Sequence, residues 1–136
     1  MAVEHLNPAG SPRVDGISQV SIGRGSKVVF FSGQVGRTLD GSPAGDDLRS
    51  QTAQALRNLQ AVAEAAGVTA ADFTKTTIMI RDYDAARFDE FMAGFGDYIG
   101  AGATIGTVAA ASTLIGVAAL YEPWCHIEID AIAVVD

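Results

Sequence analysis

Residues 27–35 read KVVFFSGQV and predict a β-strand. Val28 and Phe30 fall on one face of this extended segment. Val29 and Phe31 fall on the other face, because successive side chains of a strand point to opposite sides. A strand that is apolar on both faces is usually buried on both faces. The segment therefore predicts a sheet whose two surfaces are both covered.

Two amphipathic helices are expected after this strand. The first opens at Asp46 and Asp47, because carboxylates favour the positive end of a helix dipole, and it stops at Gly67. Its apolar positions recur every three or four residues and form one stripe: Leu48, Thr52, Ala55, Leu59, Val62 and Ala66. The second helix covers residues 84–99 and carries its own apolar face: Phe88, Phe91, Met92, Phe95 and Ile99.

The remaining strands come from shorter patterns. Residues 17–22 favour an early strand, and residues 23–26 supply a hairpin turn after it. Three later segments also predict strands: 73–81, 112–120 and 127–134. The order is β-β-(β)-α-β-α-β-β, which predicts a single α+β domain over residues 1–136 with two helices packed on one face of a sheet. Residues 1–15 are rich in Pro, Gly and Ser and predict a loosely held N-terminal arm.

The number of helices has a consequence for assembly. Two helices can cover only one face of such a sheet, whereas strands 27–35 and 112–120 are apolar on both faces. The simplest cover for the second face is another copy of the same chain. We therefore expect an obligate homo-oligomer in which the sheets of neighbouring subunits form the core.

Composition restricts the partners of the chain. The net charge is −7, from 16 acidic and 9 basic residues, and no Lys/Arg cluster occurs, which argues against a nucleic-acid partner and against RNA cleavage. One cysteine, Cys125, excludes an intrachain disulfide and fits a reducing compartment, so a cytoplasmic location is expected. No phosphate loop, metal-ligand cluster or catalytic triad pattern appears, and neither a metal nor a cofactor is expected.

One uncharged run, residues 100–121, is long enough to span a bilayer and contains a small-xxx-small step from Gly102 to Gly106. It consists mostly of Gly, Ala and Thr, with few of the large apolar residues that drive membrane insertion. A glycine-rich loop that leads into the strand at residues 112–120 is the better interpretation. No contact with a membrane is therefore expected.

The closing strand places His126, Glu128 and Asp130 on one face. Two interpretations of Glu128 stay open: it lies on a solvent-facing edge, or it faces a cleft, where it could orient or deprotonate a water molecule. At Ser32 and Gly33 the pattern is equally ambiguous. Gly33 either marks a β-bulge at the rim of the sheet or lets a small ligand approach the backbone closely.

Two other reactive residue types are given structural roles. His126 stands alone near the start of a strand, and it is interpreted as incidental rather than as a general base. Cys125, next to Trp124, is interpreted as a small hydrophobic residue rather than as a nucleophile.

Six segments, in order and at suitable spacing, resemble the Rid family, the reactive intermediate deaminases, also called YjgF or endoribonuclease L-PSP. They are Gly16-Ile17-Ser18, FFSGQVG (30–36), SQTAQALRNLQAVAEAAG (50–67), FTKTTIMIRD (73–82), STLIGVAAL (112–120) and IEIDAIAV (127–134). The resemblance runs over nearly the whole chain. It implies a chorismate-mutase-like α+β fold with a mixed sheet, and a homotrimer with three clefts between subunits.

The resemblance also implies an activity and a site. In one branch of the family the clefts hydrolyse reactive imines and enamines, with release of ammonia and a 2-keto acid. The glutamate that positions the attacking water corresponds to Glu128, and the backbone that contacts the substrate corresponds to Ser32 and Gly33. No cofactor is implied.

The chain departs from that branch at three pocket positions. Ser112 stands where the branch has an arginine that binds the substrate carboxylate, Leu114 where it has a cysteine, and Ile17 where it has an aromatic residue. A serine cannot replace the bidentate fork of arginine. The resemblance therefore points to an arginine-lacking subfamily.

Two hypotheses follow. The first is an enzyme that hydrolyses a small imine, enamine or related C–N substrate with water positioned by Glu128. The second is a non-catalytic trimer whose clefts bind a small metabolite.

Overall fold

We analysed a computed structural model of the chain, which describes residues 3–103 and 109–136. The second glycine of the small-xxx-small step, Gly106, lies outside the described residues, as does the middle of the predicted glycine-rich loop. In the described ranges no helix is long and apolar enough to cross a membrane.

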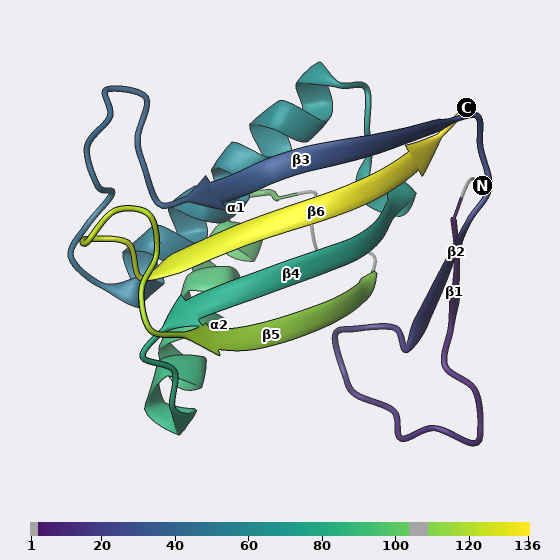
Figure 1. Ribbon diagram of the computed structural model, residues 1–136, viewed down its shortest axis with the longest axis horizontal. Helices are drawn as coiled ribbons and strands as arrows, with labels where there is room; N and C mark the ends of the chain where they lie inside the picture. The colour runs from purple at the N-terminus through teal and green to yellow at the C-terminus, as the bar shows by residue number, and fades with distance from the viewer. Residues whose placement is uncertain (1–2, 104–108) are drawn as a thin grey trace.

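The centre of the fold is a four-stranded mixed sheet in the order β3-β6-β4-β5 (Figure 1). Its strands are β3 (Lys27–Val35), β6 (Ile127–Val135), β4 (Phe73–Arg81) and β5 (Ala111–Val117). The pairs β3–β6 and β6–β4 are antiparallel, and β4–β5 is parallel. The mixed sheet of the predicted α+β fold is thus confirmed, although β5 ends three residues before the predicted strand does.

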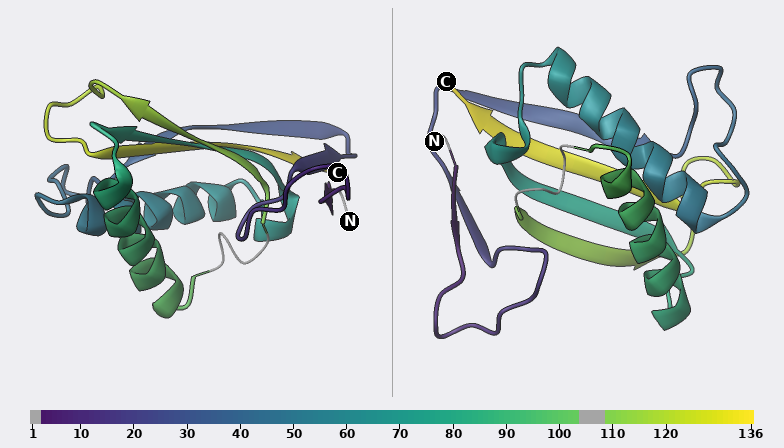
Figure 2. Two further views of the ribbon diagram at one scale, coloured as in Figure 1. Left: turned by 90° about the horizontal axis from the view of Figure 1, so that it is seen from below. Right: turned by 180° about the vertical axis from the view of Figure 1, so that it is seen from behind.

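Both long helices lie on the same face of the sheet (Figure 2). They are α1 (Leu48–Ala65) and α2 (Ala85–Gly100), and a short 3₁₀ helix, η1 (Ala70–Asp72), precedes β4. Asp47 caps α1 by accepting a hydrogen bond from the Ser50 amide at 2.7 Å, and Asp84 caps α2 by accepting one from the Arg87 amide at 2.8 Å. Each aspartate satisfies an amide that has no partner inside its helix.

The core forms where the apolar stripe of α1 meets one face of β6. Alternate residues of β6 are buried: Ile127, Ile129, Ala131 and Ala133. They pack with Leu48, Leu56 and Leu59 of α1. The residues between them, beginning with Glu128, consequently point to the opposite face of the sheet. We call that opposite surface the open face, because neither helix covers it.

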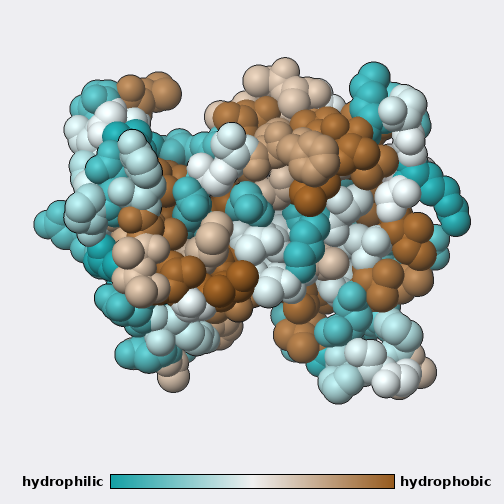
Figure 3. All heavy atoms as spheres, viewed as in Figure 1, coloured by the Kyte–Doolittle hydropathy of each residue, from teal (hydrophilic) through white to brown (hydrophobic). Residues whose placement is uncertain are grey.

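Two phenylalanines of β3 show how the faces differ. Phe31 packs against the helix-side core, whereas Phe30 is 74% exposed on the open face, next to Val28 at 57%. Figure 3, which looks onto the open face, shows apolar surface over the region of β3 and β6. The side chains that the sequence expected to be covered are therefore uncovered in a single chain, as the predicted oligomer requires.

The N-terminal part differs from the prediction. Within the expected loose arm, β1 (Val3–Leu6) pairs with β2 (Val20–Gly23) in a separate two-stranded antiparallel ribbon, and Val3 is only 1% exposed. The ribbon crosses the ends of β4 and β5 instead of forming a hairpin with β3 (Figure 1). Ser18 fixes its approach, since the Ser18 amide donates to Ala110 O at 3.3 Å.

Gln51 is a fully buried polar residue of α1 that joins three segments. Its Nε2 donates to Gly45 O at 2.9 Å and to Trp124 O at 3.0 Å, and its Oε1 accepts from the His126 amide at 2.8 Å. The backbone of Gly36 is equally close, because a Cβ there would lie 2.5 Å from Gln51 Cα. Gln51 thus fixes the loops at the end of the sheet where β6 begins.

We expect Gln51→Leu to lower the free energy of unfolding by about 2–3 kcal/mol, because three part-buried backbone groups lose their partner. The matched control is Gln54→Leu on the same helix, where the amide group bonds, among the described residues, to Asn58 and Arg57 of α1. The control is expected to cost under about 1 kcal/mol. Urea denaturation at one fixed protein concentration measures both, and equal losses for the two variants would contradict the role of Gln51.

Candidate functional site

Glu128 is the second residue of β6 and lies on the open face. In the sheet it stands between Val35 of β3 and Met79 of β4. Its side chain is half-buried rather than fully exposed. Glu128 therefore does not lie on an edge strand, since β6 has a neighbour on each side, and within a single chain the face that it occupies is uncovered.

Gly33 lies directly beside the Glu128 side chain. The register of β3 and β6 shifts between Phe31 and Gln34, so Gly33 sits in an irregularity of the strand, as one interpretation of the sequence expected. A Cβ at Gly33 would lie 2.6 Å from Glu128 Cδ and 2.8 Å from Oε1, which is closer than real contacts allow. The missing side chain of Gly33 therefore provides the space that the carboxylate occupies.

Ser32 is exposed at the same place on β3, and its carbonyl accepts a hydrogen bond from Gln34 Nε2 at 3.1 Å. The structure thus brings together three of the predicted site residues, Ser32, Gly33 and Glu128. They form a small polar area on the open face, near the end where β6 begins.

Charged and aromatic side chains surround this end of the sheet. The Arg37 guanidinium lies 5.1 Å above the ring of Trp124, and its Nη2 is 3.3 Å from Glu122 Oε1. Burial raises the pKa of the Cys125 thiol; Arg37 opposes this shift, and the charges of Glu122 and Glu128 add to it. Cys125 is therefore held in the thiol form, which fits its prediction as a hydrophobic residue rather than a nucleophile.

His126 serves as a structural connector. Its Nε2 lies 2.8 Å from Asp46 O, and its Nδ1 lies 2.8 Å from Arg87 Nη2 and 3.3 Å from Arg81 Nη2. Because a guanidinium can only donate, Nδ1 accepts and Nε2–H donates to the carbonyl. Both ring nitrogens are occupied by the protein, which agrees with the incidental role that the sequence indicated for His126.

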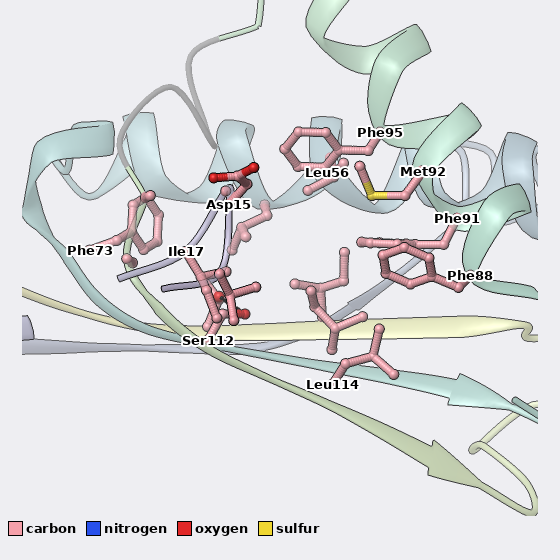
Figure 4. Close-up of a pocket in the computed structure, with 18 residues that line it drawn as sticks. Asp15, Ile17, Leu56, Phe73, Phe88, Phe91, Met92, Phe95, Ser112 and Leu114 are labelled. Atoms are coloured by element: carbon pink, nitrogen blue, oxygen red, sulfur yellow. Dashed lines mark hydrogen bonds between the residues drawn. The ribbon is translucent and has the colours of Figure 1, made fainter. Parts of the chain in front are cut away.

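The other three predicted site residues lie on the opposite, helix-covered face. Ile17, Ser112 and Leu114 line a cavity of about 310 Å³ between α2, the sheet and the segment that leads to β2 (Figure 4). The Ser112 hydroxyl accepts a hydrogen bond from Thr76 Oγ1 at 2.8 Å inside it. We call this cavity the α2 pocket.

Within a single chain the six predicted residues lie on two faces of the sheet. Strand pairing gives the reason: Met79 stands beside Glu128 on one side and beside Ile115 on the other, so Ile115 and Thr113 share the face of Glu128. Ser112 and Leu114, one residue removed, point to the helices. Thr113 and Ile115 lie on the face of Glu128, although the sequence did not single them out, and Lys75 Nζ donates to the Thr113 hydroxyl on that face.

The open-face site presents side-chain and backbone groups of several kinds. Among the residues that the structure describes, no cluster of three or more His, Cys, Asp or Glu side chains could hold a metal ion. What remains is one carboxylate, adjacent backbone groups and nearby hydroxyl, amine and guanidinium donors. Such a set can bind a small polar molecule and position a water molecule next to it.

Comparison with known proteins places the chain among related sequences and structures. Residues 16–135 match the family model described as endoribonuclease L-PSP. A 2-iminobutanoate/2-iminopropanoate deaminase from Salmonella typhimurium is 32% identical over 82 residues, which are 60% of this chain and 59% of that protein. A RutC family protein from Haemophilus influenzae is 38% identical over 55 residues, 40% of this chain and 42% of that protein. The chain thus matches less than two thirds of the length of either relative.

Among solved structures, the Rid-family protein YyfB from Yersinia pestis, described as of unknown function, has a TM-score of 0.85 and 31% identity. The alignment covers 98% of this chain and 99% of that one, so it includes the N-terminal ribbon as well as the sheet and helices. With the fold, the structural match to YyfB and the family match over residues 16–135 in agreement, the chain belongs to the Rid (YjgF, endoribonuclease L-PSP) family.

Proposed function

We propose that the protein hydrolyses a small imine, enamine or related C–N substrate on the open face, with a water molecule positioned by Glu128. The observation that carries this proposal is the fit of the Glu128 carboxylate into the space left by Gly33. The relative from Salmonella typhimurium named as an imine deaminase supports the reaction class.

The proposed reaction needs only the groups present. Glu128 takes a proton from water as the water oxygen bonds to the imine carbon, and the C=N bond becomes a C–N single bond. The protonated Glu128 passes this proton to the nitrogen, which gives a carbinolamine. Transfer of the carbinolamine hydroxyl proton to the same nitrogen then lets ammonia leave as the carbonyl C=O forms. An enamine first tautomerises to its imine. Backbone groups at Ser32 and Gly33 would hold the substrate beside the carboxylate.

The cleft itself is proposed to form between subunits of a cytoplasmic homotrimer. In a single chain the open face is uncovered, and Phe30 and Val28 expose most of their side chains there. A neighbouring subunit on this face would bury that apolar surface and would also limit the access of water to Glu128. Water exclusion strengthens the electrostatic interactions on which such a reaction depends.

The residue at position 113 bears on the substrate class. Thr113, not Ser112, shares the face of Glu128, and it offers a hydroxyl rather than a guanidinium. A substrate on this face therefore meets no bidentate carboxylate partner at this position. We propose imines that lack a carboxylate as the preferred substrates.

The catalytic role is tested with Glu128→Gln, which keeps the shape of the side chain and removes the base. Ammonia release from imines generated in situ from amines is expected to fall by roughly 10²–10⁴-fold. Asp130→Asn, on the same strand and face, is the control and should stay within a factor of three of the wild type. Full activity of Glu128→Gln would refute the assignment. Ligand-dependent thermal stabilisation without turnover in the wild type would instead support the non-catalytic binding trimer.

Substrate choice is tested by an arginine at two adjacent positions. Thr113→Arg should raise activity on carboxylate-bearing imines, made in situ from amino acids, by about ten- to a hundredfold, because one charge-assisted contact is added. Ser112→Arg should bring no such gain and should lower the melting temperature, since it forces a cation into an apolar pocket. The reverse result, with a gain only in Ser112→Arg, would show that the face assignment is wrong.

Assembly through the open face is tested with Phe30→Asp. A charge placed in the proposed interface should shift the protein from trimer to monomer in light scattering coupled to size-exclusion chromatography. Leu39→Asp is the matched control, because Leu39 is a fully exposed leucine on a loop outside the sheet. A trimer that persists in Phe30→Asp, or a wild type that is monomeric, would overturn this part of the proposal.

A further inference from the structure

A row of side chains crosses the open face at the level of Glu128. Val35 of β3 stands opposite Glu128 on one side, and Met79 of β4 stands opposite it on the other. Ile115 of β5 follows Met79 in the parallel pair of β4 and β5. Residues directly opposite one another in an antiparallel pair have Cβ atoms about 4.5–5.5 Å apart. The carboxylate therefore lies in a row whose other three members are apolar.

The carboxylate of Glu128 leans toward β3. It fills the space left by Gly33, where a Cβ would lie 2.7 Å from Glu128 Cγ and 2.8 Å from Oε1. On the β3 side the surface beside the carboxylate is consequently backbone, at Ser32 and Gly33. On the β4 side it is the side chain of Met79, with Ile115 behind it. Ile115 is 43% exposed and Met79 is half-buried, so both present apolar surface on the open face.

The threonine hydroxyls of the open face lie further from the carboxylate. Thr77 precedes Met79 by two residues and pairs with Thr113, so their row is about 6–7 Å along the strands from the row of Glu128. The Thr113 hydroxyl already accepts a hydrogen bond from Lys75. A substrate whose reacting carbon lies beside the carboxylate meets the apolar row before it meets these hydroxyls.

We propose that Met79 determines substrate specificity, because it supplies the apolar surface on which the body of the substrate lies. This inference rests on the reaction proposed at Glu128 and adds the substrate class: imines with an unbranched aliphatic chain, in preference to imines of equal size that carry a hydroxyl group. The C=N end meets the backbone at Ser32 and Gly33, and the chain extends over Met79 toward Ile115. Each further methylene buried there should raise kcat/KM about fourfold.

Substrate preference is measured as ammonia release from two imines of matched size, generated in situ from pentan-2-amine and from 3-aminobutan-1-ol at matched rates of imine formation. The wild type should prefer the imine of pentan-2-amine by about tenfold in kcat/KM, because the hydroxyl group loses hydration on an apolar surface. Met79→Gln keeps the length of the side chain, adds an amide and should abolish the preference, whereas Met79→Leu should retain it. The ratio within one protein cancels any loss of stability or assembly. An unchanged ratio in Met79→Gln would overturn the proposal.

Methyl NMR locates binding without turnover. The chain contains three methionines, Met1, Met79 and Met92, and Met92 lies in the α2 pocket on the helix-covered side (Figure 4). In protein labelled with carbon-13 at the methionine methyl groups, pentan-2-one, which carries C=O in place of C=N, should shift the Met79 signal saturably and leave the Met92 signal in place. The Met79→Leu protein assigns the Met79 signal. The hydroxylated analogue, 4-hydroxybutan-2-one, should bind about tenfold more weakly.

The two measurements separate this inference from the reaction on which it rests. An absent Met79 shift, or a shift of the Met92 signal alone, would overturn the role of Met79 even if Glu128→Gln loses all activity. A saturable Met79 shift in a wild-type protein that releases no ammonia would refute the reaction and support Met79 as the binding surface.

Discussion

The register of β6 is the constraint on which the rest of the structure depends. This strand pairs with β3 on one side and with β4 on the other, and its alternate residues Ile127 and Ile129 are buried against α1. That burial fixes which side of every strand faces the helices, because neighbouring residues in a sheet share a face. A slip by one residue would bury Glu128 in the apolar core and expose the isoleucines.

Much of the fold could be predicted because its signals are local. The apolar stripe of α1 and the caps Asp47 and Asp84 depend only on nearby residues, and the structure contains these helices close to the expected bounds. The ribbon of β1 and β2 was missed because β1 has only four residues, VEHL, and depends on a partner fourteen or more residues further along the chain. Its pairing is a tertiary property, which local patterns do not contain.

The candidate site was predictable only in part, for the same reason. Glu128 and Gly33 were identified separately, and the structure shows that one fills the space left by the other. Ser112 and Leu114 were expected in the same inter-subunit cleft as Glu128, and within one chain they lie on the other face of the sheet. The alternation within β5 was readable, but which alternate set joins Glu128 depends on how β5 pairs with β4 and how β4 pairs with β6. To know which residues of β5 share a face with Glu128, one needs both the β5–β4 register and the β4–β6 register. Neither register can be deduced from the sequence of one strand.

The strand β5 presents Ser112 and Leu114 to one compartment and Thr113 and Ile115 to another. Consecutive residues of β5 lie on opposite faces of the sheet. A single amino-acid substitution in this strand therefore changes either the helix-covered face or the open face and leaves the other almost unchanged. Natural variation at odd and even positions can therefore be selected separately. Related proteins can therefore differ at the residues on one face of β5 and keep those on the other face. A sequence identity calculated over the whole strand would combine these two sets of positions and hide the difference.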